Sequence, residues 1–502
     1  MKAWDDFALR MKQLGDLGHM GSLMGWDQQV MMPPKGVEAR ASAMGTLAAI
    51  RHERVVDPVL GDLIETLTEA ELDDERKMMV KRVKRNRDIS VKLPARLVEE
   101  LAETTGKAHP VWQKARDTDD FSIFEPHLDN IFKLLAERAE HLGYENEVYD
   151  AHLDLFEMGA TTADVEPVFK RVADEIHPLL DKVFKTDTAD WNLPETPNHL
   201  DDLLTYSRDL LARFGYDLDA GRLDLAAHPF CSGLDSGDVR VTTRLNAKNP
   251  KECILATVHE MGHGFYEQGI PDKWKGTSIG KYVSLGVHES QSRLWENHVA
   301  RSRSFWEGEA PRASKAIAPW AGLGADDYYR AANRVDPESY IRVEADELTY
   351  PLHVILRFEL EIAISRGELK AGDLPSAWNE AMQKHLGITP PGDGKGVLQD
   401  VHWAAGLFGY FPTYLLGSIY SAALFAKATQ DLGGETAVDA SLAAGRFEGL
   451  LGWLRDKVHS QGALHDPSDL MAAATGLAAG SQIDTAPYID YLKKKFGDLY
   501  GI

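Results

Sequence analysis

Apolar residues recur at three- and four-residue spacing through long windows of this chain, for example at Ile131, Leu134 and Leu135. This spacing places apolar side chains on one face of an α-helix. The alternating pattern of a strand is scarce. Its best example is the β-branched segment 238–244, which follows the turn-rich sequence SGLDSG. The patterning therefore predicts a mainly helical protein with one small β-element.

The domain organisation follows from the length and the loop signals. A chain of 502 residues is long enough for several domains. However, the Pro- and Gly-rich segments 31–36, 192–198 and 388–396 are typical of loops within one body rather than linkers between domains. We expect a single helical domain over residues 1–502, with two lobes around a groove.

The charge balance excludes several partners. Asp and Glu number 78 and Lys and Arg number 55, which gives a formal net charge of −23. Nucleic acids and anionic membranes both require basic surfaces, so neither is expected as a partner. The two cysteines, Cys231 and Cys253, imply no disulfide framework. The first twenty residues lack the apolar core of an export signal. We expect a cytoplasmic protein.

One segment requires a test against a membrane span. Residues 403–426 contain no charged side chain and are long enough to cross a bilayer. The segment also contains Pro412, three glycines, three tyrosines and several hydroxyl side chains. These residues favour a buried segment beside a polar site over a membrane helix.

A helix start precedes the most informative motif, HEMGH at 259–263. Asn249 is a good N-cap residue, Pro250 occupies the first helical position, and Glu252 lies where a capping box places its carboxylate. Gly269 is a typical stop signal. The sequence therefore predicts a helix that begins at Pro250 and carries the whole motif.

The motif has the spacing of a metal site. His259 and His263 are four residues apart on one helical face, so both imidazoles can reach one zinc ion, and Glu260 beside them can accept a proton from water. An open catalytic site needs a third protein ligand. The next predicted helix offers Glu289 and Glu296 on a similar face, and spacing alone does not choose between them.

Further segments resemble one family. HEMGH followed by HESQ at 288–291 is similar to the carboxypeptidase Taq family of thermostable metallocarboxypeptidases. Other segments resemble that family's motifs and occur in a consistent order along the chain: MGWDQQVMMPPKG at 24–36, HPF at 228–230, DVRVT at 238–242, IRVEAD at 341–346, GVLQDVHW at 396–403 and FGYFPTYLLG at 408–417.

The resemblance implies a helical body with a deep central groove, like that of neurolysin or angiotensin-converting enzyme, and a homodimer. It implies Glu289 as the third ligand. It also implies release of single C-terminal residues from peptides with a free C-terminus, with broad side-chain tolerance. The implied cofactor is one divalent metal per chain, zinc in the first place, with cobalt or manganese as alternatives.

Peptide hydrolysis also requires donors for the charge that develops on the carbonyl oxygen. His402 and the nearby Tyr410 and Tyr414 are the candidates, and the resemblance favours Tyr414. Glu260 would act first as the base for water and then as the acid toward the leaving amine.

An exopeptidase must also bind a free carboxylate, which an arginine fork matches. Arg342 and Arg240 are the candidates. The alternative for Arg342 is an i,i+4 ion pair with Asp346, on a helix opened by Asp336 and Pro337. The alternative for Arg240 is an exposed strand residue.

Three more polar residues lie close to these motifs. His228, His288 and Asp400 are expected to support or pack against the site rather than to bind the metal. Two other functions remain open: an oligoendopeptidase with the same motif, and a catalytically inactive, zinc-stabilised scaffold or peptide-binding protein. The presence of Glu260 argues against the scaffold, because a structural zinc site needs no base.

Overall fold

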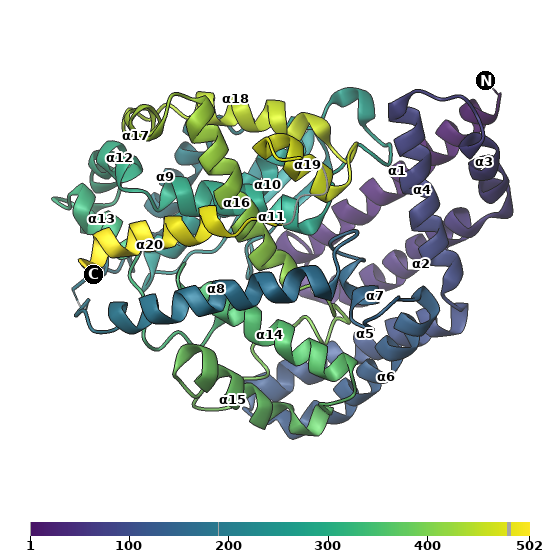
Figure 1. Cartoon of the computed structure of the whole chain (residues 1–502), viewed down its shortest axis with the longest axis horizontal. Helices are drawn as coiled ribbons and strands as arrows, with labels where there is room; N and C mark the ends of the chain where they lie inside the picture. Colours follow the sequence, from purple (N-terminus) through teal and green to yellow (C-terminus); the bar gives the residue numbers. More distant parts are fainter. Residues whose placement is uncertain (1, 189, 479–482) are drawn as a thin grey trace. The chain divides into compact units, whose positions relative to one another are not determined.

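The computed structural model describes residues 2–188, 190–478 and 483–502, and most of them are helical (Figure 1). The chain divides into two compact units. The first comprises residues 1–91, 190–332 and 420–481, and the second comprises residues 92–189, 333–419 and 482–502. The predicted helical class with one small β-element is confirmed. The prediction of one domain over residues 1–502 stays a prediction.

The first unit contains the N-terminal helices and the helix with the HEMGH motif (Figure 1). Its helices are α1 (Lys2–Val30), α2 (Val37–Val56), α3 (Pro58–Thr68), α4 (Asp74–Lys92), α9 (Leu200–Phe214), α10 (Pro250–Gly269), α11 (Leu285–Arg293), α12 (Arg303–Ala316), α13 (Ala325–Ala332), α17 (Glu435–Ala443), α18 (Glu448–Lys457), α19 (Pro467–Thr475) and the end of α16 (Pro412–Asp431).

A three-stranded sheet completes the first unit. Its strands are β1 (Gly221–Leu225), β2 (Cys231–Asp235) and β3 (Asp238–Thr243), in the order β1-β3-β2. Strand β3 is parallel to β1 and antiparallel to β2. The predicted strand is thus the central one. Both β2 and β3 lie against α10, so the β-element borders the helix that carries HEMGH.

Helix α10 begins at Pro250, as predicted, but its cap differs from the prediction. The Asn249 side chain makes no capping hydrogen bond. Instead the backbone N–H of Asn249 donates to the Asn246 side chain (3.2 Å). The carboxylate of Glu252 accepts from the Asn246 amide (3.0 Å) and from Arg244. The predicted capping box is wrong because the turn before the helix supplies better partners for Glu252.

Two glycines of α10 serve close packing. A Cβ on Gly269 would lie 2.4 Å from the Cβ of His459, so the helix end packs directly on the 459–461 turn. Gly269 remains helical, and α10 ends after it rather than before it. A Cβ on Gly262 would lie 2.5 Å from the carbonyl oxygen of Gln291 and 2.6 Å from the Cα of Ser292. Glycine at 262 therefore lets the backbone of α11 lie directly on α10.

The regular elements among the described residues of the second unit are all helices, joined by irregular segments. Its elements are α5 (Ala95–Asp117), α6 (Glu125–Leu142), α7 (Asp150–Leu153), α8 (Thr162–Val183), α14 (Tyr350–Ser365), α15 (Leu374–Leu386), α20 (Ala486–Tyr500) and the start of α16. Helix α14 is buried over most of its circumference and packs against α8 and α15. Its buried polar residues therefore need partners within the protein.

The uncharged segment 403–426 consists of irregular turns followed by the first part of α16, and most of its side chains are buried. Among the helices in the described part of the chain, none combines the length and apolarity required to cross a bilayer.

Candidate metal centre

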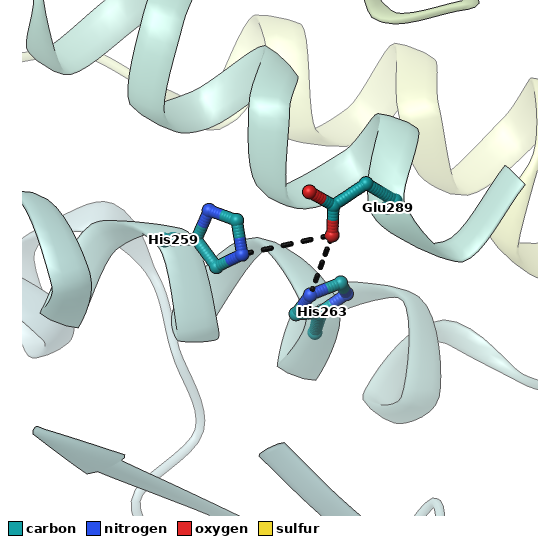
Figure 2. Close-up of side chains that lie close together, drawn as sticks. All are labelled: His259, His263 and Glu289. Carbon is teal, nitrogen blue, oxygen red and sulfur yellow. Dashed lines mark ion pairs between the residues drawn. The ribbon is translucent and has the colours of Figure 1, made fainter. Parts of the chain in front are cut away.

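The contact at Gly262 brings the HESQ segment of α11 onto the HEMGH segment of α10. One donor atom each from His259, His263 and Glu289 then lie within 4.8 Å of one another. Figure 2 shows both imidazole rings turned toward the same carboxylate oxygen. This oxygen, Glu289 Oε2, lies 3.3 Å from His263 Nε2 and 3.7 Å from His259 Nε2. The sequence-predicted triad is thus brought together within one unit.

Contacts behind the two imidazoles fix their orientation. The Nδ1–H of His259 donates to Glu296 Oε2 (2.8 Å), and the Nδ1–H of His263 donates to the backbone carbonyl of His288 (3.0 Å). With Nδ1 protonated, each neutral ring presents the lone pair of Nε2. Two nitrogen lone pairs and one carboxylate oxygen therefore face a common point. This donor set fits a divalent metal with a further position for water.

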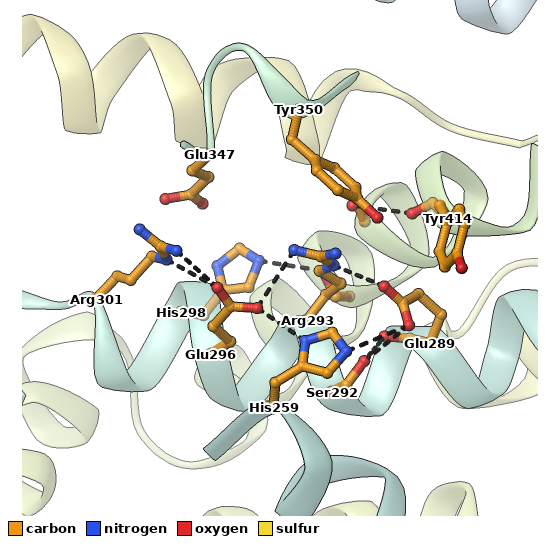
Figure 3. A network of polar contacts seen from close by, with 12 residues as sticks. His259, Glu289, Ser292, Arg293, Glu296, His298, Arg301, Glu347, Tyr350 and Tyr414 are labelled. Carbon is orange, nitrogen blue, oxygen red and sulfur yellow. Dashed lines mark hydrogen bonds and ion pairs between the residues drawn. The ribbon is translucent and has the colours of Figure 1, made fainter. Parts of the chain in front are cut away.

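The geometry gives different positions to the two glutamates that spacing could not distinguish. Glu289 belongs to the convergent set, whereas Glu296 lies behind His259. Two arginines hold these carboxylates (Figure 3). Arg293 donates to Glu289 Oε1 (2.7 Å) and contacts Glu296 Oε2 (3.3 Å), and Arg301 donates to Glu296 Oε1 (2.7 Å). The sequence reasoning missed both arginines, although Arg293 lies one helical turn after Glu289.

The network determines the protonation of the site. Burial opposes ionisation of both Glu289 and Glu296. The positive charge of Arg293, together with His259, nevertheless lowers the pKa of Glu289. Arg301 and Arg293 lower the pKa of Glu296 in the same way. Burial also opposes charging of His259, yet the two carboxylates raise its pKa. Both glutamates are therefore ionised at neutral pH. As the pH falls, protons compete with a metal for Nε2 of His259, so metal affinity should fall as the pH falls.

Glu260 differs from these carboxylates. Its side chain is buried, and among the described residues it has no hydrogen-bond or ion-pair partner. Burial raises its pKa, whereas His259 and His263 act in the opposite direction. A carboxylate with a raised pKa and no fixed donor is suited to accept and return a proton.

His288 and His228 lie outside the convergent set. The His288 ring stacks between those of His263 and Tyr282, with centroids 4.2 Å apart on each side. Burial and the neighbouring His263 lower its pKa to about 4, so the ring is neutral and packs. His228 is exposed in the turn before β2.

The second unit holds a separate charged cluster. The Asp400 carboxylate accepts from Arg342 Nη2 (2.8 Å) and from Arg357 Nε (2.6 Å). Gln399 Oε1 accepts from the backbone N–H of Arg342 (2.8 Å) and from Arg357 Nη2 (2.7 Å). Among the described residues, Arg342 Nη1 has only the Tyr350 hydroxyl as hydrogen-bond partner, at 3.4 Å. The outer edge of the Arg342 guanidinium, at Nη1, therefore makes only one long hydrogen bond.

The alternative ion pair between Arg342 and Asp346 is wrong. Asp336 and Pro337 open no helix, and Arg342 lies in a short 3₁₀ turn, so the two side chains do not share a helical face. Asp346 instead accepts from the backbone N–H groups of Leu348 and Thr349 (2.9 Å each).

His402 lies beside this cluster. Its Nε2 is 3.1 Å from the hydroxyl of Tyr414, whereas its ring contacts that of Tyr410 at a centroid distance of 5.3 Å. Its Nδ1 is 3.7 Å from Asp400, beyond a hydrogen bond. Burial lowers the pKa of His402 to about 3. Asp400 acts to raise this pKa and Arg342 acts to lower it, so the net result is a neutral ring. Of the two candidate tyrosines, Tyr414 is the one paired with His402.

Arg240, in the first unit, has its fork occupied. Its Nε and Nη2 both donate to the Asp238 carboxylate (2.8 Å each), and its guanidinium lies 4.3 Å from the ring centroid of Trp26. This geometry makes Arg240 a poorer carboxylate receptor than Arg342.

Comparisons with known proteins place these features in context. The model of the carboxypeptidase Taq (M32) metallopeptidase family matches residues 6–496. Thermostable carboxypeptidase 1 of Thermus thermophilus is 41% identical over 500 residues, covering 97% of this chain and 96% of the relative. Carboxypeptidase 1 of Bacillus subtilis is 38% identical over 500 residues, covering 98% and 97%.

Solved structures agree with the sequence relatives. The crystal structure of the M32 carboxypeptidase from Deinococcus radiodurans superposes with a TM-score of 0.94 at 35% identity, over 100% of both chains. A Pyrococcus furiosus carboxypeptidase structure superposes with a TM-score of 0.92 at 36% identity, over 99% of both chains. The fold is therefore shared over the full length of these proteins.

Proposed function

The chain belongs to the carboxypeptidase Taq (M32) family of metallopeptidases, and on this premise we propose that it releases single residues from the free C-terminus of peptides, with broad side-chain tolerance. Family membership makes it a metal-dependent peptide hydrolase. The observation that carries the finer proposal is the convergence of His259, His263 and Glu289 beside the unpartnered carboxylate of Glu260.

We propose that His259, His263 and Glu289 hold one divalent metal, with zinc the best match to two imidazoles and one carboxylate and cobalt or manganese as alternatives. Such a metal supplies Lewis acidity toward water and a peptide carbonyl. Glu260 takes the proton from the attacking water on its carboxylate and later returns it to the leaving amine. Its raised pKa supports both steps, because the protonated form is stable enough to act as an acid.

The second unit supplies the other proposed groups. The neutral His402 and the hydroxyl of Tyr414 are hydrogen-bond donors for the negative charge that develops on the carbonyl oxygen, with Tyr410 as the alternative tyrosine. Arg342 binds the free carboxylate of the substrate through the outer edge of its guanidinium, at Nη1. Its inner edge, Nε and Nη2, is already held by Asp400. Arg240 is the second candidate.

Three broader properties complete the proposal, of which the homodimer rests on family likeness. They are a single domain over residues 1–502, a homodimer and a cytoplasmic location. The free thiols of Cys231 and Cys253 fit a reducing compartment.

A pair of peptides tests the proposal directly. Purified protein is incubated with a short peptide and with its C-terminally amidated twin, with and without added zinc or cobalt, and the products are followed by mass. We expect stepwise loss of single residues from the free peptide only. Internal cuts in both peptides would instead assign an endopeptidase. Metal binding without any cleavage would favour the scaffold and contradict the role of Glu260.

A further inference from the structure

A pocket of about 660 Å³ opens within the first unit. Helices α1, α2 and α4 line it together with β2 and the loop 276–281, and Figure 1 shows these helices at the N-terminal part of the chain. The HEMGH motif and its ligands do not line this pocket. Its lining is rich in glycine and in basic side chains, although the whole chain carries a net charge of −23.

Two cations of the pocket lack counter-charges. Arg51 on α2 and Lys281 in the loop both line it, and neither forms an ion pair or hydrogen bond with any described residue. Asp235 is the acidic residue of the described lining. Its carboxylate accepts from the backbone N–H of Gly237 (2.6 Å) and lies 3.9 Å from Lys275. The pocket therefore has an excess of positive charge.

A second pocket, bordered by α1, α2 and α3, has a different charge balance. It is lined by Arg10 and Arg54 among others. There Arg10 pairs with Asp57 (2.6 Å), and Arg54 donates to the Gln13 side chain (2.6 Å). Arg51 and Arg54 lie one turn apart on α2, yet of the two only Arg54 has a partner among the described residues.

The cations around Lys281 also repel one another. Lys281 is exposed, and Arg82, Arg51 and Arg85 lie close enough to disfavour its positive charge. A bound anion would relieve this repulsion and would be attracted by it, because a concave site of one charge sign concentrates the opposite charge. The pocket chemistry thus favours an anionic group.

The pocket lies within reach of the metal centre. Lys281 is followed by Tyr282, whose ring stacks on His288 at 4.2 Å, and His288 stacks on His263 at 4.2 Å. An extended peptide spans about 3.3–3.6 Å per residue. These ring contacts connect the pocket wall at Lys281 to His263, and we expect a peptide that extends from His263 to reach the pocket.

We propose that Arg51 and Lys281 form a subsite for an acidic side chain of the substrate peptide, on the N-terminal side of the scissile bond. This inference rests on the proposed carboxypeptidase function. A carboxypeptidase leaves only one residue on the other side of the scissile bond, so the remainder of the peptide must lie on the N-terminal side. An acidic side chain there would replace the counter-charge that the protein does not provide.

The test is a peptide scan. Alanine-based peptides of about eight residues carry one Glu at successive upstream positions, beside an all-neutral parent. At one or two positions Glu should raise kcat/KM about three- to fivefold, the size of a partly exposed ion pair. About 0.5 M salt should remove most of this preference. The double variant R51A/K281A should lose it, whereas Arg54→Ala should keep it.

Charge reversal makes the test independent of simple loss of structure. Lys281→Glu should reverse the preference toward peptides with Lys at the same position, whereas Arg54→Ala should cleave the neutral parent as the wild type does. If no Glu position is preferred, or if Lys281→Glu retains the preference for Glu, the subsite is overturned. Absence of cleavage of the neutral parent would instead contradict the proposed function itself.

Discussion

Two buried charged clusters, one in each unit, have opposite charge balances. In the first unit, the carboxylates of Glu289 and Glu296 pair with the guanidiniums of Arg293 and Arg301, and the carboxyl group of Glu260 lies close to both glutamates without a partner of its own among the described residues. In the second unit, Arg342 and Arg357 share the single carboxylate of Asp400, beside the neutral His402. With neutral imidazoles and ionised carboxylates, these residues sum to one negative charge in excess in the first cluster and one positive charge in excess in the second.

This difference suggests what each cluster binds. Burial of an uncompensated charge is costly, so an excess charge at a buried site is typical of a site that receives a ligand of the opposite sign. Under the proposed function the first cluster receives a metal cation and the second receives the carboxylate of the peptide. The first cluster also directs lone pairs at one point, whereas the second already satisfies the Asp400 carboxylate fully.

The largest effect is expected at Glu260. Glu260→Gln removes the proton acceptor without touching the three donor atoms of the metal set, so kcat should fall about 1000-fold while metal content stays at one per chain. Turnover of a free peptide and metal analysis of the purified variant measure both quantities. Near-normal turnover in the metal-loaded variant would show that the excess negative charge serves only metal binding.

Asp400→Asn should have the next largest effect, on stability. It leaves Arg342 and Arg357 buried without a counter-charge, and removal of one partner from a buried ion pair costs about 3 kcal/mol or more. The shift of the urea midpoint measures this loss. Asp174→Asn is the matched control, because its pair with Lys170 is largely exposed and should contribute less than about 1 kcal/mol. Equal midpoints for the two variants would mean that the second cluster does not depend on Asp400.

A smaller effect, on metal affinity, is expected at Glu296, which accepts a hydrogen bond from His259. Glu296→Gln keeps an acceptor for the Nδ1–H of His259 but removes its charge, and such changes usually weaken metal binding about 10- to 100-fold. Competition with a chelator of known affinity measures the change. Glu307→Gln removes an exposed carboxylate on α12 and serves as the control. An unchanged metal affinity would mean that only Glu289 and the two histidines of the first cluster contribute to metal binding.

The sequence predicted the first cluster much better than the second. The spacing of His259 and His263 on a helix opened by Pro250 is a local property, so the pair could be predicted without tertiary information. Spacing could not separate Glu289 from Glu296, because the helix continues through a π-helical stretch, Leu294–Ala300, which changes the phase of its side chains. No residue pattern indicates such a stretch in advance.

The partner of Arg342 could not be predicted for a different reason. Asp400 lies 58 residues further along the chain, and only the packing of the 399–403 turn against α14 brings the two together. Local reasoning selected Asp346 because it assumed a helix where the structure has a short turn. Long-range ion pairs between irregular segments leave no periodic signal in the sequence.

The smallest effect concerns Glu361, on α14 one turn after Arg357. Its carboxylate accepts from the hydroxyl of Tyr149 (2.6 Å), the indole N–H of Trp403 (2.8 Å) and the backbone N–H of Gly409 (3.1 Å), so it holds both ends of the turn that follows His402. Burial nevertheless raises its pKa to about 7, against the effect of these donors.

The sign of the pH dependence follows from that shift. The folded protein holds a proton on Glu361 that the unfolded chain has already lost, so the stabilising contribution is complete below the unfolded pKa near 4.5 and is lost as the pH rises through about 7. Between about pH 6 and pH 8 the wild type should lose about 1 kcal/mol relative to Glu361→Gln, which cannot titrate. Urea midpoints of both proteins at the two pH values measure this difference. Parallel pH profiles would mean that the three donors keep Glu361 ionised at both pH values.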